Sequence, residues 1–278
     1  MNQENILTFS KFKYLKWSLW LALVCIFLYV TDSPDKPVGG STIIGYTLGT
    51  IGAILIVWLM LFGIRKRAYQ SNLGSVRGWL SAHVYLGLSL VLIATLHSGF
   101  NFGVNLQTLT YALTIMVVSS GLWGVAMYLS KPAIINSVLN GKTLEQAGEA
   151  LIEIDRQSEK VAGQLDHSIQ KIIQSSIQTP IFEHPWHRYL DKKFTCATSQ
   201  AVEILTKIYE KNENKPNSSN RLVEDLYTLQ LKRQLQLSQI RSYLFHKGWN
   251  DIWLVFHVSL SFFLLGALIA HIISVFVY

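Results

Sequence analysis

Three long stretches of this chain contain no charged side chain. Asp, Glu, Lys and Arg are absent from residues 37–64, from 78–130 and from 252–278. A helix needs about 20 consecutive apolar residues to cross the hydrocarbon core of a bilayer, and each stretch is long enough for that. The chain of 278 residues is half hydrophobic and only 15% charged, which is a low share for a soluble domain. The sequence therefore predicts a protein embedded in a membrane.

These stretches and the N-terminal segment predict five transmembrane helices. Residues 99–107 (GFNFGVNLQ) divide the longest stretch, because two Gly and two Asn suit a turn better than a helix interior. The first span is expected to be a retained anchor, since it is long and no small-residue cleavage site follows it. The predicted spans are 14–31, 43–64, 79–100, 108–129 and 252–276.

Lys and Arg residues near the span ends predict the orientation, because they favour the cytoplasmic side. The cations gather in the N-terminal segment and between the second and third spans, at Lys11, Lys13, Lys16, Arg65, Lys66, Arg67 and Arg77. The N-terminus is therefore expected in the cytoplasm and the C-terminus outside, with the bacterial inner membrane as the expected location. The net charge of +7 is explained by anionic lipid beside the spans, so we expect no nucleic-acid partner.

The polar segment between the fourth and fifth spans is expected to be helical. Apolar residues recur at helical spacing over 143–177, which predicts one long amphipathic helix. Further helices are expected over 194–211 and 221–246. The segment has no Gly-rich phosphate loop, so we expect it to dock on a partner or to stiffen the bundle.

Together these features predict an all-α protein, namely a five-helix transmembrane bundle with a helical cytoplasmic insertion between helices four and five. Residues 1–130 are expected to hold the first four spans and 251–278 the fifth. The insertion is expected to occupy 131–250.

Four of the eight histidines lie inside predicted spans, in two pairs of equal spacing. The third span holds His83 and His97, and the fifth holds His257 and His271. The 14-residue spacing raises the second imidazole by about 21 Å along a helix and returns it nearly to the same face. Because one span separates these two helices, they cross the membrane in the same direction. We therefore expect His83 to face His257 on the cytoplasmic side and His97 to face His271 on the outer side.

Two imidazoles on opposite faces of a porphyrin complete a six-coordinate iron. The chain has no Cys-x-x-Cys-His motif for covalent attachment, so two haems b are expected. With Cys25 and Cys196 alone, a four-cysteine iron–sulfur site is excluded. Hydrogen bonding between helices could explain one intramembrane histidine, but not two matched pairs. A proton relay would need carboxylates, which these spans lack.

Further residues of the sequence are candidates for a supporting role or for a separate site. Gly87 and Gly99 lie close to them in the sequence and would leave room for a flat macrocycle. Arg77 lies near the inner membrane face and is a candidate partner for a haem propionate. His184 and His187 flank a proline, which favours a surface turn over a metal site.

The two His-x13-His segments resemble the di-haem transmembrane cytochromes b, such as cytochrome b of quinol-oxidising bc complexes and the membrane domains of ferric reductases. The resemblance covers His83 to His97, with the Ser-Gly-Phe that follows, and His257 to His271. It implies two bis-histidine haems. The sequence shows neither a Pro-Glu-Trp-type quinol motif nor a flavin or nicotinamide domain after its last span, so direct use of NADPH is not expected.

We therefore expect a membrane di-haem cytochrome b subunit that moves electrons across the bilayer. Its expected partners are membrane lipid, a quinone and an outer-side redox protein, such as a multihaem cytochrome c or an iron–sulfur subunit. Two alternatives remain open at this point. One is a non-redox membrane scaffold or sensor whose cytoplasmic helices bind a partner, and the other is a stand-alone ferric reductase.

Overall fold

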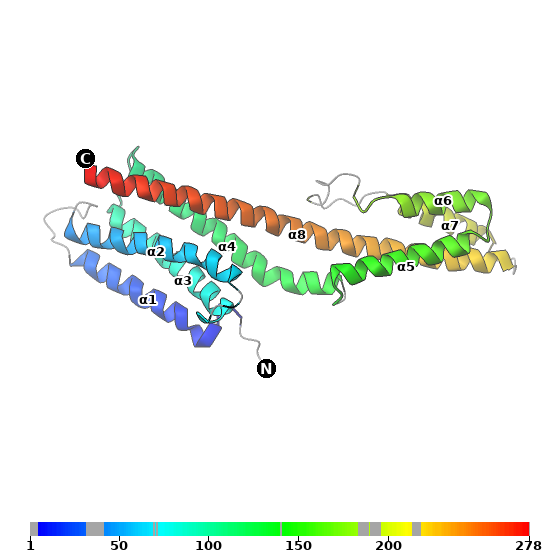
Figure 1. Ribbon diagram of the computed structural model, residues 1–278, viewed down its shortest axis with the longest axis horizontal. Coiled ribbons are helices and arrows are strands. Elements are labelled where there is room, and N and C mark those ends of the chain that lie inside the picture. Colours follow the sequence, from blue (N-terminus) through cyan, green and yellow to red (C-terminus); the bar gives the residue numbers. More distant parts are fainter. Residues whose placement is uncertain are drawn as a thin grey trace. The chain divides into compact units, whose positions relative to one another are not determined.

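The computed structural model forms eight helices and no strand over the residues that it describes (Figure 1). The described residues are 5–31, 42–68, 70, 72–139, 141–182, 189, 196–212 and 218–277. The chain divides into two compact units. Unit 1 comprises Met1–Ala126 and Trp253–Tyr278, and unit 2 comprises Met127–Ile252. The all-α class predicted from the sequence is confirmed for the described residues.

Five helices contain a stretch that is long and apolar enough to cross a membrane. They are α1 (Phe9–Val30), α2 (Ile43–Arg67), α3 (Val76–Ser98), α4 (Leu106–Val138) and α8 (Ser218–Val277). Their apolar stretches fall where the uncharged parts of the sequence predicted them, so the number of candidate spans is confirmed. These helices make the chain an integral membrane protein by length and composition.

α4 and α8 are longer than predicted. The fourth predicted span ends at residue 129, whereas α4 continues to Val138. The predicted helix over 221–246 and the fifth span form a single helix of 60 residues, α8. No proline occurs within α8, and an isolated glycine in a helix interior costs only about 1 kcal/mol. The backbone therefore has no reason to break near residue 248, and α8 contributes to both units.

Local capping sets the ends of the two helices that matter most for the site. The side chain of Thr42 accepts a hydrogen bond from the Gly45 N–H (2.9 Å) at the start of α2. Ser75 accepts one from the Gly78 N–H (3.1 Å) at the start of α3. Gly99 ends α3 with φ of 58°, in the left-handed region that favours glycine. These interactions set where α2 and α3 begin and where α3 ends.

α3 packs against both α1 and α2 in unit 1. Polar contacts join α1 to α3, since the hydroxyl of Ser18 lies 2.6 Å from that of Ser89 and 2.9 Å from the carbonyl oxygen of Tyr85. Apolar packing alone gives helices little reason to associate in lipid, so small residues and such hydrogen bonds stabilise the contact. The buried apolar core of this unit consists of Cys25, Leu48, Leu55, Ile56, Leu59, Leu90, Ile93, Leu96, Leu264 and Leu268.

Unit 2 contains α5 (Leu144–Ala162), α6 (His167–Gln178), α7 (Ala197–Asn212) and the first part of α8. The single helix predicted over 143–177 is therefore wrong. The chain turns at Gly163, which ends α5, and α6 begins after Asp166. Apolar residues on both sides of this turn enter one buried cluster with α7 and α8, so the turn lets both amphipathic faces cover the same core.

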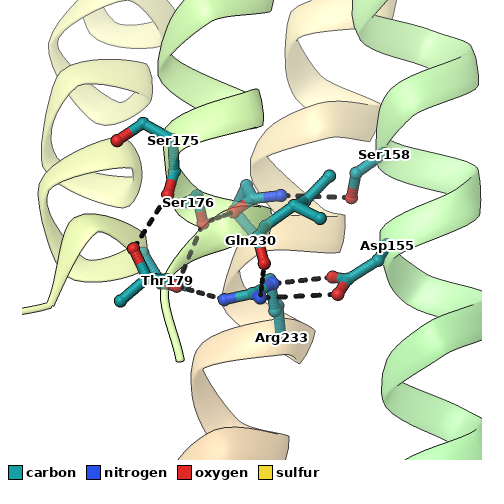
Figure 2. Close-up of polar contacts among 9 residues, drawn as sticks. Asp155, Ser158, Ser175, Ser176, Thr179, Gln230 and Arg233 are labelled. Atoms are coloured by element: carbon teal, nitrogen blue, oxygen red, sulfur yellow. Dashed lines mark hydrogen bonds and ion pairs between the residues drawn. The ribbon is translucent and has the colours of Figure 1, made fainter. Parts of the chain in front are cut away.

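A polar network is buried inside unit 2. Figure 2 shows Gln230 and Arg233 of α8 directed toward Ser158 and Asp155 of α5. The Arg233 side chain is only 2% exposed, and its Nε donates to Asp155 Oδ1 at 2.6 Å. The Gln230 amide donates to Ser158 Oγ at 3.1 Å and accepts from Ser176 Oγ of α6 at 3.0 Å. A buried charge needs such partners, because an unpaired one is strongly unfavourable.

Candidate functional site

α3 and the last part of α8 bring four histidines together as two pairs in unit 1. The ring centroids of His83 and His257 lie 6.4 Å apart, and those of His97 and His271 lie 6.2 Å apart. Two imidazoles that bind one metal ion at metal–nitrogen distances of about 2 Å have centroids about 6 Å apart. The centroid separation of each pair is therefore compatible with two imidazoles on opposite sides of one metal ion.

Each pair offers two nitrogen ligands from the protein. Across the part of the chain that the structure describes, no group of three or more His, Cys, Asp or Glu side chains is placed to hold a metal ion. A bare zinc ion in a protein takes three or four protein ligands, whereas a porphyrin supplies four nitrogens of its own. The donor set of each pair therefore fits a haem iron better than a bare metal ion.

Helix α2 orients both histidines of α3. The Nδ1 atom of His83 lies 3.1 Å from the Leu59 carbonyl oxygen, and that of His97 lies 2.8 Å from the Gly45 carbonyl oxygen. A carbonyl oxygen can only accept a hydrogen bond, so both Nδ1 atoms carry the proton. The lone pair of Nε2 is then free to bind a metal ion in each ring.

The contacts of Ser120 favour the same tautomer in His257. Its Nδ1 atom lies 2.7 Å from Ser120 Oγ on α4. Ser120 Oγ also lies 2.7 Å from the Val117 carbonyl oxygen, which can only accept, so both contacts are hydrogen bonds only if Ser120 donates to Val117 and accepts from the Nδ1–H of His257. His271 differs, because the described residues give its ring no hydrogen bond. The hydroxyl of Ser274 donates instead to the backbone carbonyl of His271 at 2.8 Å.

Glycines on α2 and α3 leave room beside the rings. A Cβ atom placed on Gly49 would lie 2.7 Å from Cε1 of His97, closer than any side chain tolerates. Gly87 is buried on α3, yet a Cβ atom placed there would meet no atom within 4 Å. Open space therefore lies beside Gly87, one of the two glycines predicted to leave room for a macrocycle. The other, Gly99, ends α3. Gly49 was not predicted, because its proximity to His97 depends on how α2 packs.

Arg77 is exposed in the first turn of α3. It precedes His83 by six residues, which is about 9 Å along a helix. Its predicted role as a propionate partner stays a prediction. His184 and His187 lie outside the described residues, so the structure does not bear on the surface turn predicted there.

Aromatic rings flank the pair formed by His83 and His257. The Phe62 ring of α2 lies 5.2 Å from the His83 ring, and the Trp253 ring lies 5.6 Å from the His257 ring. One turn before His83, the indole of Trp79 stacks on that of Trp58 at 5.2 Å. These aromatic side chains limit the positions open to the two imidazoles.

Comparisons with known proteins leave the site to be interpreted from its geometry. No family model matches the chain, and no curated protein or solved structure matches it significantly. The spacing, pairing and tautomers of the four histidines therefore carry the functional interpretation.

Gly49 provides a sensitive test of the pair formed by His97 and His271. Substitution of Gly49 with Ala should displace the His97 ring, because the new methyl group would overlap it. If the two pairs bind haem, as the sequence predicts, we expect the haem between His97 and His271 to be lost and the haem between His83 and His257 to be retained. Gly63→Ala on the same helix is the matched control, since a Cβ atom there meets no atom within 4 Å. Haem content per chain measures the effect, and equal loss in both variants would contradict the proposed contact.

Proposed function

We propose that this chain is an integral membrane di-haem cytochrome b subunit that moves electrons across the bilayer between the quinone pool and a redox partner. The observation that carries this proposal is the pair of ring separations, 6.4 Å and 6.2 Å, at two levels of the same two helices. The levels are about 21 Å apart along α3, which is most of the thickness of a hydrocarbon core. When bound, each haem iron would change between its ferric and ferrous states with no open position for a substrate.

The protein's own contribution is to bind and orient. Three of the four imidazoles have the Nδ1 proton held by an acceptor, which leaves Nε2 as the ligand atom. Such a hydrogen bond fixes the plane of the ring and raises its basicity. Four rings held on continuous helices need little rearrangement when the oxidation state changes, which favours electron transfer.

The proposed topology is a five-helix bundle with a helical cytoplasmic insertion. Lys and Arg near the ends of α1, α2 and α3 support a cytoplasmic N-terminus. This orientation puts His83 and His257 near the cytoplasmic face and His97 and His271 near the outer face. The bacterial inner membrane is the proposed location, and a quinone and an outer-side redox protein are the proposed partners.

Transfer across the bilayer can be tested in sealed proteoliposomes with ferricyanide trapped inside and dithionite added outside. We expect the trapped ferricyanide to be reduced much faster than in protein-free vesicles, because two haems bridge the membrane. The His97→Ala protein is the control, because it should lack the haem proposed between His97 and His271 and therefore one step of the electron transfer. If the trapped acceptor stays oxidised while the haems are reduced, transmembrane transfer is wrong. A colourless protein would favour the scaffold or sensor alternative.

A further inference from the structure

His257 lies in a cluster of side chains from α4 and α8 that differs from the surroundings of the other three histidines. The indole of Trp253, one turn before His257, stacks on the imidazole with an interplanar angle of 26°. The Trp253 Nε1–H donates to the Ser120 carbonyl oxygen at 2.7 Å. Trp253 therefore contacts both His257 and Ser120, the hydrogen-bond partner of His257.

Glycines on α4 make this cluster possible. A Cβ atom on Gly124 would overlap the Trp253 indole, and one on Gly121 would lie 3.4 Å from Cε1 of His257. Any larger residue at position 124 would push the indole away from α4. The sequence Ser120-Gly121-Leu122-Trp123-Gly124 thus presents a hydroxyl and two bare backbone positions to α8.

The partner of His257 is a side chain, whereas those of His83 and His97 are backbone carbonyls of α2. A hydroxyl can be removed by a single substitution, but a helix carbonyl cannot. Since its own hydrogen is donated to Val117, the Ser120 hydroxyl acts on His257 as an acceptor. It therefore favours one tautomer and one ring orientation.

We propose that Ser120 is the positioning residue for His257, and that Trp253 holds Ser120 in place. The hydrogen bond from His257 to Ser120 fixes the Nδ1-protonated tautomer and makes Nε2 a stronger ligand. A more basic axial imidazole stabilises ferric over ferrous iron, which lowers the midpoint potential of the inner haem. The effect on the potential rests on the proposed function, whereas the effect on the tautomer does not.

The first test compares Ser120→Ala with the unaltered protein in a redox titration. We expect the midpoint potential of the inner haem to rise and its retention to weaken by about 10- to 100-fold, as for other partners of metal-binding histidines. The outer haem should not change. Ser120→Thr keeps a hydroxyl and should restore both properties. Ser119→Ala is the matched control, because Ser119 is an exposed neighbour on the same helix.

A second test needs no haem. Nitrogen NMR spectra of histidine-labelled protein in its haem-free form report which ring nitrogen carries the proton. We expect His257 to be protonated at Nδ1, and Ser120→Ala to lose that preference. Trp253→Phe keeps the stacking but removes the N–H, so it should weaken the preference without removing it.

The outcomes separate the two proposals. If Ser120→Ala keeps the Nδ1-protonated tautomer, the role of Ser120 is wrong whatever the haem content of the protein. If the tautomer changes but the unaltered protein binds no haem, the positioning role stands and the proposed function fails. If haem is bound and the inner potential is the same in both proteins, the proposed effect on the iron is wrong.

Discussion

Replacement of His97 or His271 by Ala should abolish the outer haem and leave the inner haem largely intact. Each proposed haem would be held by one histidine of α3 and one of α8, so loss of one histidine removes half of the protein's ligands to that iron. The other pair is about 21 Å away along the helix and keeps both of its imidazoles. Haem content should fall from two to one per chain, with loss of one component of the reduced-minus-oxidised spectrum.

His83→Ala should have the complementary effect, with loss of the inner haem and retention of the outer one. His167→Ala is the control, because His167 is exposed at the start of α6 in unit 2. Spectra that keep both haems in the His97 and His271 variants would defeat the assignment of these residues as ligands.

Asp155→Ala should strongly destabilise unit 2. The variant would leave Arg233, whose side chain is 2% exposed, without its carboxylate partner. Removing one partner of a buried ion pair costs about 3–5 kcal/mol, because the remaining charge stays buried and unpaired. Hydrogen exchange of the full chain in detergent should show faster exchange in α5, α6, α7 and the first part of α8.

Two further variants separate the effect of an unpaired buried charge from the effect of any substitution in unit 2. Glu153→Ala breaks the exposed pair with Arg156 one turn along the helix and should have a much smaller effect. The double variant Asp155→Leu with Arg233→Met replaces the pair by apolar groups and should recover most of the lost stability. Wild-type exchange rates in Asp155→Ala would show that the pair contributes little to unit 2.

The sequence predicted the membrane character and the histidine pairs for simple physical reasons. Long uncharged stretches have few alternatives to a membrane span, so the five candidate helices were found. The 14-residue spacing and the parallel direction of α3 and α8 then predicted which histidines face each other, and the structure brings together the same pairs.

Other features were missed because they depend on packing. The acceptors for the histidine protons lie on α2 and α4, and no motif marks Gly45, Leu59 or Ser120 as neighbours of a histidine. The turn at Gly163 was missed because apolar spacing continues across it. The continuity of α8 was missed because polar residues near 248 resemble a boundary, although nothing there breaks a helix.

The central claim is that each pair of imidazoles binds one haem, and haem stoichiometry combined with a reduced-minus-oxidised spectrum of the purified chain tests it most directly. We expect two haems b per chain, extractable without covalent attachment, with sharp Soret and alpha bands on reduction. A protein purified from haem-replete cells that carries no haem, or one whose spectrum does not depend on His83, His97, His257 and His271, would contradict the claim.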